Sequence, residues 1–320
     1  FMQKIFRRKK GPQKKVYTTP ERIRVTIEEL GPTYIKFGQI LADRPDMVAE
    51  RFRNELKKLQ SKARPFDDED AIRLIRKELG LEIEDVFEEF DHRCLASASI
   101  GQVYKARLKS GENVIVKIQR PHIENKIKLD LYLMRYLARS AVKSYPELAA
   151  IDIIGLIDEF GMNIIKELDY YNEASNLLRF VEMFKDDPRV HIPKVFMEYT
   201  TRRILVMEQV IGVTPDSPES LVKSNLDPAA IAAQGADIVL KMVLKHGFFH
   251  ADPHPGNLFI LPGNVIALID FGMVGVLKPN HLNFLASFAM GFYRSDASAI
   301  TQSLIRSEEH TSELQSRITI

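Results

Sequence analysis

The 320-residue chain has one cysteine, Cys94, so it excludes an internal disulfide bond and fits a reducing compartment. It has no apolar run of about 18 residues, and it therefore predicts no transmembrane helix within the given sequence. Polar and charged residues interrupt the apolar stretch 229–249, which is expected to form an amphipathic helix. The formal net charge is only +2, so no global field favours a nucleic-acid partner.

The near balance of charge hides a basic tail over residues 1–20, which holds seven Lys and Arg residues and no acid. The tail also lacks the apolar core of a signal peptide. Two interpretations stay open. The tail is attracted to an anionic membrane surface, with about 1 kcal/mol per basic residue, or it is a solvated segment with no partner.

The strongest chemical signal is His250-Ala-Asp-Pro-His-Pro-Gly-Asn257 followed by Asp270-Phe-Gly272. These segments match the H-x-D-x-x-x-x-N catalytic loop and the D-F-G metal loop of protein kinases. Asp252 is predicted to orient or deprotonate an attacking hydroxyl. Asn257 and Asp270 offer the hard oxygen ligands that Mg²⁺ prefers. The pattern predicts a site for nucleotide phosphates and divalent metal.

The segment around the two metal-ligand candidates reads as a hairpin. Residues 257–260 and 264–269 are short apolar runs, separated by a Pro262-Gly263 turn. The hairpin is expected to carry Asn257 at its start and Asp270 at its end. His250 is expected to support the loop backbone by hydrogen bonding rather than to act as a base.

A kinase glycine-rich loop, G-x-G-x-x-G-x-V, is expected upstream of this site. Only its last glycine, Gly101, and its valine are present, because Ala96 and Ala98 replace the first two glycines. A Cβ restricts positive φ and close approach to phosphates, so the loop is expected to be stiffer than usual. The nucleotide-binding residues predicted here are Ala96, Ser97, Ala98, Ser99, Gly101 and Val103.

Residues 103–107 and 113–118 read as a second hairpin, and its second strand ends near Lys117. This lysine is predicted to reach the nucleotide phosphates, as in the V-A-I-K strand of kinases. A buried lysine stays charged only when it is paired. The candidate partners are Glu167 and Glu173, and the sequence leaves the choice open.

The interval between Lys117 and these glutamates is longer than in ordinary kinases. Residues 126–139 and 149–165 have apolar side chains at helical spacing, which predicts an extra helix pair inserted into the small lobe. Residues 203–210 then resemble the last small-lobe strand and the hinge. Backbone groups of Glu208 and Val210 are expected to hold the adenine edge.

Together these segments resemble the UbiB family of atypical kinases, also called AarF or ADCK proteins, over about residues 28–300. The family's K-x-G-Q and E-x-D motifs add to the alanine-rich loop and the kinase loops already described. The matching residues of these two motifs are Lys36, Gly38 and Gln39, and Glu167 and Asp169.

The resemblance implies an α+β, bilobal protein-kinase-like fold with an N-terminal helical extension, a helical insertion in the small lobe and a truncated C-terminal lobe. Residues from 306 on resemble translated adapter sequence rather than natural protein. The expected division is a basic tail over 1–20, the extension with K-x-G-Q over 21–92, the small lobe over 93–211, a partial large lobe over 212–305, and a non-native tail over 306–320.

The resemblance also implies ATP or ADP and Mg²⁺ as cofactors, and an ATPase or a small-molecule or lipid kinase supporting ubiquinone or related isoprenoid-quinone biosynthesis. The implied partners are quinone-pathway lipids or lipid-modifying enzymes and an anionic membrane surface. Family likeness places the protein in the cytoplasm, peripheral to the inner or plasma membrane of a bacterium, and family members often end in membrane helices. A regulatory role is implied for Lys36, Gly38, Gln39 and Asp169, with Lys36 facing the E-x-D segment.

Two other functions are compatible with the same residues. In the first, the alanine-rich loop and Lys36 suppress phosphoryl transfer, and the protein is a nucleotide-gated scaffold for lipids or partners. In the second, the loop from His250 to Asn257 belongs to an aminoglycoside- or choline-type kinase, whose H-G-D-x-H-x-x-N loop it also resembles. The K-x-G-Q motif and the alanine-rich loop argue against the second.

Overall fold

A computed structural model describes residues 17–59, 65–145 and 152–305 of the chain. Most of the basic tail and the segment from 306 on lie outside the described residues, so the predictions made for them stay predictions. The described residues form two compact units. One takes those up to Phe66, with Ala96–Gln102 and Arg120–Ile164. The other takes Asp67–Leu95, Val103–Gln119 and those from Ile165 on.

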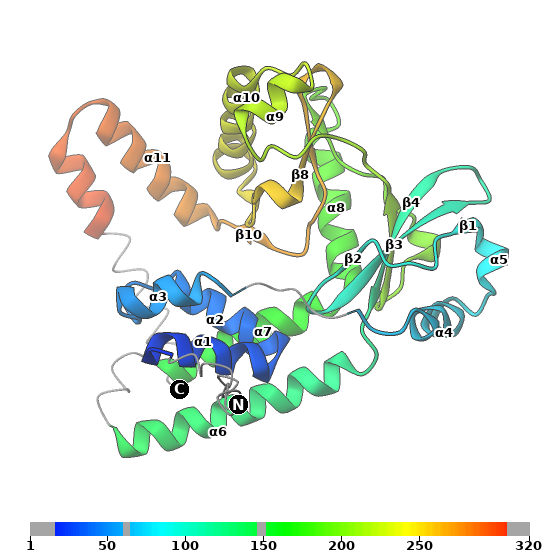
Figure 1. Cartoon of the computed structure of the whole chain (residues 1–320). Coiled ribbons are helices and arrows are strands. Elements are labelled where there is room, and N and C mark those ends of the chain that lie inside the picture. The colour runs from blue at the N-terminus through cyan, green and yellow to red at the C-terminus, as the bar shows by residue number, and fades with distance from the viewer. Residues whose placement is uncertain (1–16, 60–64, 146–151, 306–320) are drawn as a thin grey trace, which may run out of the picture. The chain divides into compact units, whose positions relative to one another are not determined.

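The first unit is mainly helical (Figure 1). Its first helix begins with a capping box, in which Thr18 and Glu21 satisfy each other's backbone N–H groups. That helix ends at Gly31, whose φ of 104° suits glycine. The elements of this unit are α1 (Thr19–Leu30), α2 (Pro32–Ala42), α3 (Glu50–Leu56), β2 (Ala96–Ser97), α6 (Ile123–Ser144) and most of α7 (Ile153–Glu167).

The long helix α6 packs together with α2 and α7. Phe37 of α2 packs against Phe160 of α7, with ring centroids 5.3 Å apart and the ring planes tilted by 50°. Thr33 of α2 donates a buried hydrogen bond of 2.6 Å to Asp130 of α6. The predicted helices at 126–139 and 149–165 correspond to α6 and α7, whose bounds are wider for α6 and later in the sequence for α7.

The second unit contains a sheet in the order β1-β3-β4-β6, with the helix α8 (Tyr170–Phe184) following the inserted helices (Figure 1). β4 pairs antiparallel with β6, and the register sets Lys117 opposite Leu205. The burial of β4 alternates until its last two residues, as expected of a strand with one core face. The strands are β1 (Phe87–Phe90), β3 (Gly101–Leu108), β4 (Asn113–Gln119) and β6 (Ile204–Glu208).

The predicted hairpin around Pro262-Gly263 is present as antiparallel β8 (Leu258–Leu261) and β9 (Val265–Leu268). A single 3₁₀ turn, η5 (Pro262–Asn264), joins them, and Gly263 has a φ of 78° there. β9 also pairs in parallel with β5 (Val190–His191), and β7 (Phe248–His250) pairs antiparallel with β10 (Val274–Val276). The loop from His250 to Asn257 therefore runs from β7 to β8 and the D-F-G loop from β9 to β10, so each loop joins two strands that pair with the strands flanking the other.

The remaining elements complete the second unit. The stretch 229–249 is not one α-helix: α10 ends at Leu240, a π-helical turn follows, and β7 then begins. The core of the second unit packs α8, β6 and the β8–β9 hairpin around Phe180, Phe248 and Phe271. The further elements are α4 (Asp68–Leu79), α5 (Ile83–Val86), η2 (Met197–Tyr199), α9 (Pro218–Lys223), α10 (Pro228–Leu240), η3 (Lys241–His246), η4 (Pro255–Asn257) and α11 (Pro279–Tyr293).

No helix among the described residues is long and apolar enough to cross a membrane.

Candidate nucleotide site

Lys117 on β4 meets two carboxylates. Its Nζ lies 2.5 Å from Glu173 Oε1 and 3.7 Å from Asp270 Oδ2. Burial by itself lowers the pKa of the Lys117 ammonium, but the charges of Asp270 and Glu173 outweigh burial and hold that pKa above its ordinary value. The lysine therefore stays protonated across the physiological range.

The sequence left two candidate partners for Lys117, Glu167 and Glu173. The structure pairs it with Glu173, in the first turns of α8. The Glu173 carboxylate is buried, and it also accepts a hydrogen bond of 3.4 Å from the Phe271 N–H. Burial raises the pKa of Glu173, followed by repulsion from Asp270, while Lys117 opposes both effects. Glu167 ends α7. Lys117 is thus paired with Glu173 and lies near Asp270.

The D-F-G segment is held by a hydrogen bond from α8 and by one within the segment itself. Asn176 of α8 donates a hydrogen bond of 2.9 Å to the Phe271 carbonyl, and the Phe271 side chain is fully buried. The Gly272 N–H donates to Asp270 Oδ1 at 2.9 Å. Asp270 Oδ2 points towards Lys117, and the Asp270 side chain is 47% exposed. A carboxylate that is fixed at one oxygen and accessible to solvent is suited to bind a cation.

His250 connects the two loops. Its Nδ1 accepts a hydrogen bond of 3.1 Å from the Asp252 N–H, so the proton of the neutral ring lies on Nε2 and is donated to the Asp270 carbonyl. Burial lowers the pKa of His250, although the Asp270 carbonyl and nearby carboxylates oppose this. The neutral ring is the form that makes both contacts. This is the backbone-supporting role expected from the sequence.

Asp252 and Asn257 are also in direct contact. Asn257 Nδ2 donates to Asp252 Oδ2 at 2.9 Å and to the Asp252 carbonyl at 3.1 Å. Because the amide nitrogen is used in this way, the amide oxygen of Asn257 is its remaining ligand atom. Asp252 is exposed.

Mg²⁺ fits the chemistry of these donors. Within the described parts of the chain, no group of three or more His, Cys, Asp or Glu side chains is arranged to hold a metal ion. Mg²⁺ in phosphate sites usually takes only one or two carboxylates and completes its shell with phosphate oxygens and water. Asn257 and Asp270 match that requirement.

The position of α8 depends on Gln119, a residue that the sequence analysis missed. Gln119 lies two residues after Lys117, so both side chains leave the same face of β4. Its Nε2 donates to the carbonyl of Leu168, and it lies 3.5 Å from the Arg202 carbonyl. The sequence signal is a glutamine that ends an apolar strand two residues after Lys117, and its burial requires a hydrogen-bond partner.

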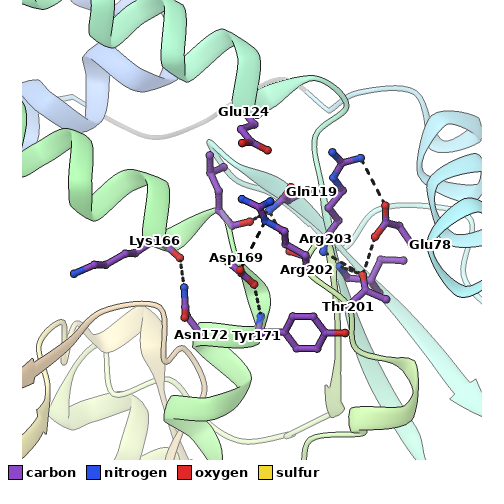
Figure 2. A network of polar contacts seen from close by, with 12 residues as sticks. Glu78, Gln119, Glu124, Lys166, Asp169, Tyr171, Asn172, Thr201, Arg202 and Arg203 are labelled. Atoms are coloured by element: carbon purple, nitrogen blue, oxygen red, sulfur yellow. Dashed lines mark hydrogen bonds and ion pairs between the residues drawn. The ribbon is translucent and has the colours of Figure 1, made fainter.

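The E-x-D segment runs from the last residue of α7 to the N-cap of α8 (Figure 2). Asp169 is the N-cap residue, because its Oδ1 accepts a hydrogen bond of 3.0 Å from the Tyr171 N–H. Arg202 Nε lies 3.7 Å from the other Asp169 oxygen, and the Tyr170 N–H donates to the Arg202 carbonyl at 3.1 Å. Asp169 therefore fixes the start of the helix that carries Glu173.

The alanine-rich loop is held by Arg120, also missed from the sequence. Arg120 Nη2 lies 2.7 Å from Ser97 Oγ, and Arg120 Nε donates to the Ala98 carbonyl at 3.1 Å. The Ala98 N–H donates to the Gly101 carbonyl at 2.8 Å. Ser99 and Val103 are partly buried. These bonds restrict the loop, but its contact with phosphates stays a prediction.

The hinge residues are at the end of β6. The Glu208 N–H donates to the Lys194 carbonyl at 2.8 Å, so that amide is already in use. The Glu208 carboxylate lies 3.0 Å from His191 Nε2 and accepts a hydrogen bond of 3.0 Å from the Lys194 N–H. Val210 lies just beyond the strand. The adenine contacts of both residues stay predictions.

The K-x-G-Q motif lies on α2 in the other unit. Gly38 is buried, and a Cβ built there would lie 2.6 Å from a methyl group of Leu59. Gln39 Nε2 donates to the Leu59 carbonyl at 3.1 Å. Two of the motif's residues thus hold Leu59 against α2. Lys36 and Asp169 belong to different units, and the expected approach of Lys36 to the E-x-D segment stays a prediction.

Comparison with known proteins identifies the relatives. A family model described as "ABC1 atypical kinase-like domain" matches residues 58–304. The chain is 36% identical over 300 residues to "Probable protein kinase UbiB" of Marinobacter nauticus, covering 92% of this chain and 55% of that protein. It is 40% identical over 265 residues to the chloroplast protein "ACTIVITY OF BC1 COMPLEX KINASE 1" of Arabidopsis thaliana, covering 82% and 39%.

A solved structure has a similar fold. The complex of Rv3197 with erythromycin, from Mycobacterium tuberculosis, matches with a TM-score of 0.63 at 26% identity, covering 88% of this chain and 71% of that one. The predicted family resemblance and the predicted α+β kinase-like fold are both confirmed. The chain spans about half the length, or less, of these two curated relatives.

Proposed function

Because the chain belongs to the ABC1 atypical kinase-like family, which includes the UbiB and ADCK proteins, we propose that it binds ATP with Mg²⁺ and hydrolyses or transfers the terminal phosphoryl group. The observation that carries the proposal is the position of the Lys117 ammonium, 2.5 Å from Glu173 and 3.7 Å from Asp270. A charged lysine next to a solvent-accessible carboxylate suits a site for phosphates and metal.

Each residue has a defined task in this proposal. Lys117 neutralises phosphate charge, and Glu173 keeps it in position. Asn257 and Asp270 hold Mg²⁺, which supplies further charge neutralisation when bound. Asp252 orients the acceptor hydroxyl and takes its proton as the new P–O bond forms and the bond to ADP breaks. The alanine-rich loop, Glu208 and Val210 bind the rest of the nucleotide.

The biological setting is proposed from family membership. UbiB relatives favour a role in ubiquinone or related isoprenoid-quinone biosynthesis, with a lipid, a small molecule or water as the phosphoryl acceptor. We propose that the protein works at a membrane surface, close to such lipids and to the enzymes that modify them. The regulatory roles of Lys36, Gly38, Gln39 and Asp169 belong to the same proposal.

The test combines calorimetry and turnover. ATP with Mg²⁺ is titrated into the protein, and phosphate release is then followed with and without liposomes. Asp270→Asn is expected to abolish turnover, whereas Asp186→Asn, an exposed carboxylate outside the site, is the matched control. Absence of binding heat contradicts the proposal, and unchanged turnover in Asp270→Asn attributes the hydrolysis to a contaminant.

A scaffold function is the second candidate, and one observation favours it. Arg120 bonds to the Ala98 carbonyl and the Ser97 hydroxyl, which restricts the alanine-rich loop. A scaffold binds ATP with measurable heat but releases no phosphate. Phosphorylation of choline or an aminoglycoside by the protein would instead favour the third alternative.

A further inference from the structure

The helix α6 has an apolar stripe that no described element of its own unit covers. Five side chains at helical spacing make up this α6 stripe, and each is between 41% and 64% exposed. Their separations of three and one residues place them in one row on the helix. The residues of the α6 stripe are Leu129, Tyr132, Leu133, Tyr136 and Leu137.

The orientation of α6 is fixed by the opposite face. Ile127, Leu131 and Met134 are buried there. Asp130, on the same side, accepts the buried hydrogen bond from Thr33 of α2. A rotation of α6 that buried the α6 stripe would expose these side chains and break that bond. The stripe is therefore held outward by the packing of its own unit.

The charges around the α6 stripe have one sign. The exposed charged side chains of α6, a helix that is described along its whole length, are all basic. Neither of its two acids is fully exposed. Asp130 is buried, and Glu124 is partly buried and lies 2.7 Å from Lys128. The exposed basic residues are Lys126, Lys128, Arg139 and Lys143.

We propose that the α6 stripe docks on an anionic lipid surface, with α6 lying in the plane of the interface. Leucine side chains enter the boundary between headgroups and acyl chains, tyrosine rings sit at headgroup level, and the basic residues face lipid phosphates. The charge complementarity decides the occupant, because the cores of protein interfaces are depleted in lysine. The helix is 22 residues long but carries charges along its length, so it rests on the surface and does not span it.

This inference deepens the membrane clause of the proposed function, and it rests on that clause but not on ATP chemistry. It differs from the possible action of the basic tail, because it assigns the contact to named residues of a packed helix. Vesicle binding by the catalytically impaired Asp270→Asn protein distinguishes a failure of the lipid inference from a failure of the ATP proposal. If that variant binds vesicles, the lipid-docking inference holds even though ATP turnover is lost.

The experiment measures partition of the full chain onto vesicles by flotation. The vesicles contain phosphatidylglycerol in phosphatidylcholine, or phosphatidylcholine alone. The stripe variant is Leu133→Gln with Tyr136→Gln. The control replaces Leu240 and Tyr293, which are also exposed but lie on α10 and α11, with Gln.

The wild type is expected to bind anionic vesicles and to bind neutral ones weakly. The stripe variant should lose about tenfold or more in partition, while the control keeps wild-type binding. Arg139→Gln with Lys143→Gln should lose about tenfold and become less sensitive to salt. Thermal unfolding should be unchanged in all of them, since the replaced side chains are exposed.

Three results overturn the inference. The stripe variant binds anionic vesicles as well as the wild type does. Binding is lost instead on Lys9→Gln with Lys10→Gln, which assigns the surface to the basic tail. Light scattering finds a dimer that the stripe variant dissociates, in which case a second copy of the chain covers α6.

Discussion

The Lys117 ammonium and the Glu173 carboxylate lie 2.5 Å apart, although 56 positions separate them in the sequence. β4 ends two residues after Lys117, and α8 begins three residues before Glu173. The inserted helices α6 and α7 lie between them in the chain. Gln119 and the Leu168 carbonyl close this long connection next to the ion pair, so β4 and the start of α8 meet at two adjacent points.

Removing the Glu173 carboxylate should break its ion pair with Lys117. In Glu173→Gln, Lys117 loses its nearer carboxylate and keeps the more distant Asp270, so a buried cation loses most of its charge compensation. We expect the free energy of unfolding to fall by about 3 kcal/mol, together with a loss of ATP turnover. Denaturant unfolding and phosphate release measure the two effects.

The matched control for that variant is Glu182→Gln, an exposed residue of the same helix. It should leave both quantities near wild type, since exposed ion pairs contribute little. Equal effects of the two substitutions would show that the Lys117 pair has no special importance.

Gln119→Leu tests whether the start of α8 is held from β4. The substitution keeps a similar volume but leaves the buried Leu168 carbonyl without its donor. The expected loss in unfolding free energy is about 1 to 3 kcal/mol. Because α8 carries Glu173, the KM for ATP should rise as well. A variant with wild-type stability and KM would mean that the contact positions nothing.

Asp169 can be separated into a capping role and a charge role. Asp169→Ala should lower the unfolding free energy by about 1 kcal/mol, while Asp169→Asn should keep it, because asparagine is an equally good N-cap residue. If Asp169→Asn also keeps ATP turnover, capping accounts for the residue. If turnover falls at unchanged stability, the carboxylate acts on nucleotide or metal, as the E-x-D resemblance implies.

His250 should make stability depend on pH. Burial lowers its folded-state pKa below the ordinary value of about 6.5, so the unfolded chain binds the proton more readily. Its contribution is complete above about pH 6.5 and is lost as the pH falls towards the folded pKa. His250→Gln should flatten this part of the profile. Urea unfolding of both proteins between pH 7.5 and 5 gives the comparison, and parallel profiles would exclude His250 as the cause.

Local sequence was sufficient where short-range patterns decide structure. The Pro262-Gly263 turn between two apolar runs predicted the β8–β9 hairpin, and the apolar alternation before Lys117 predicted β4. The spacing within the two loops predicted Asp252, Asn257 and Asp270 as one group, and the structure places Asp252 and Asn257 in direct contact. The 229–249 prediction was wrong about a single α-helix, because the π-helical turn and the tight Gly247 bend depend on packing that periodicity does not report.

What the sequence by itself determined is which chemical groups are present and in what order, since motif spacing follows from short loops and strand ends. What only the tertiary structure decided is which distant groups meet. Glu167 and Glu173 were equivalent as partners of Lys117 until the turn at Leu168, bonded to Gln119, set the start of α8 and aimed Glu173 at β4. The two apolar faces of α6 were likewise indistinguishable in sequence. Packing against α2 and α7 buried one of them and left the α6 stripe outside.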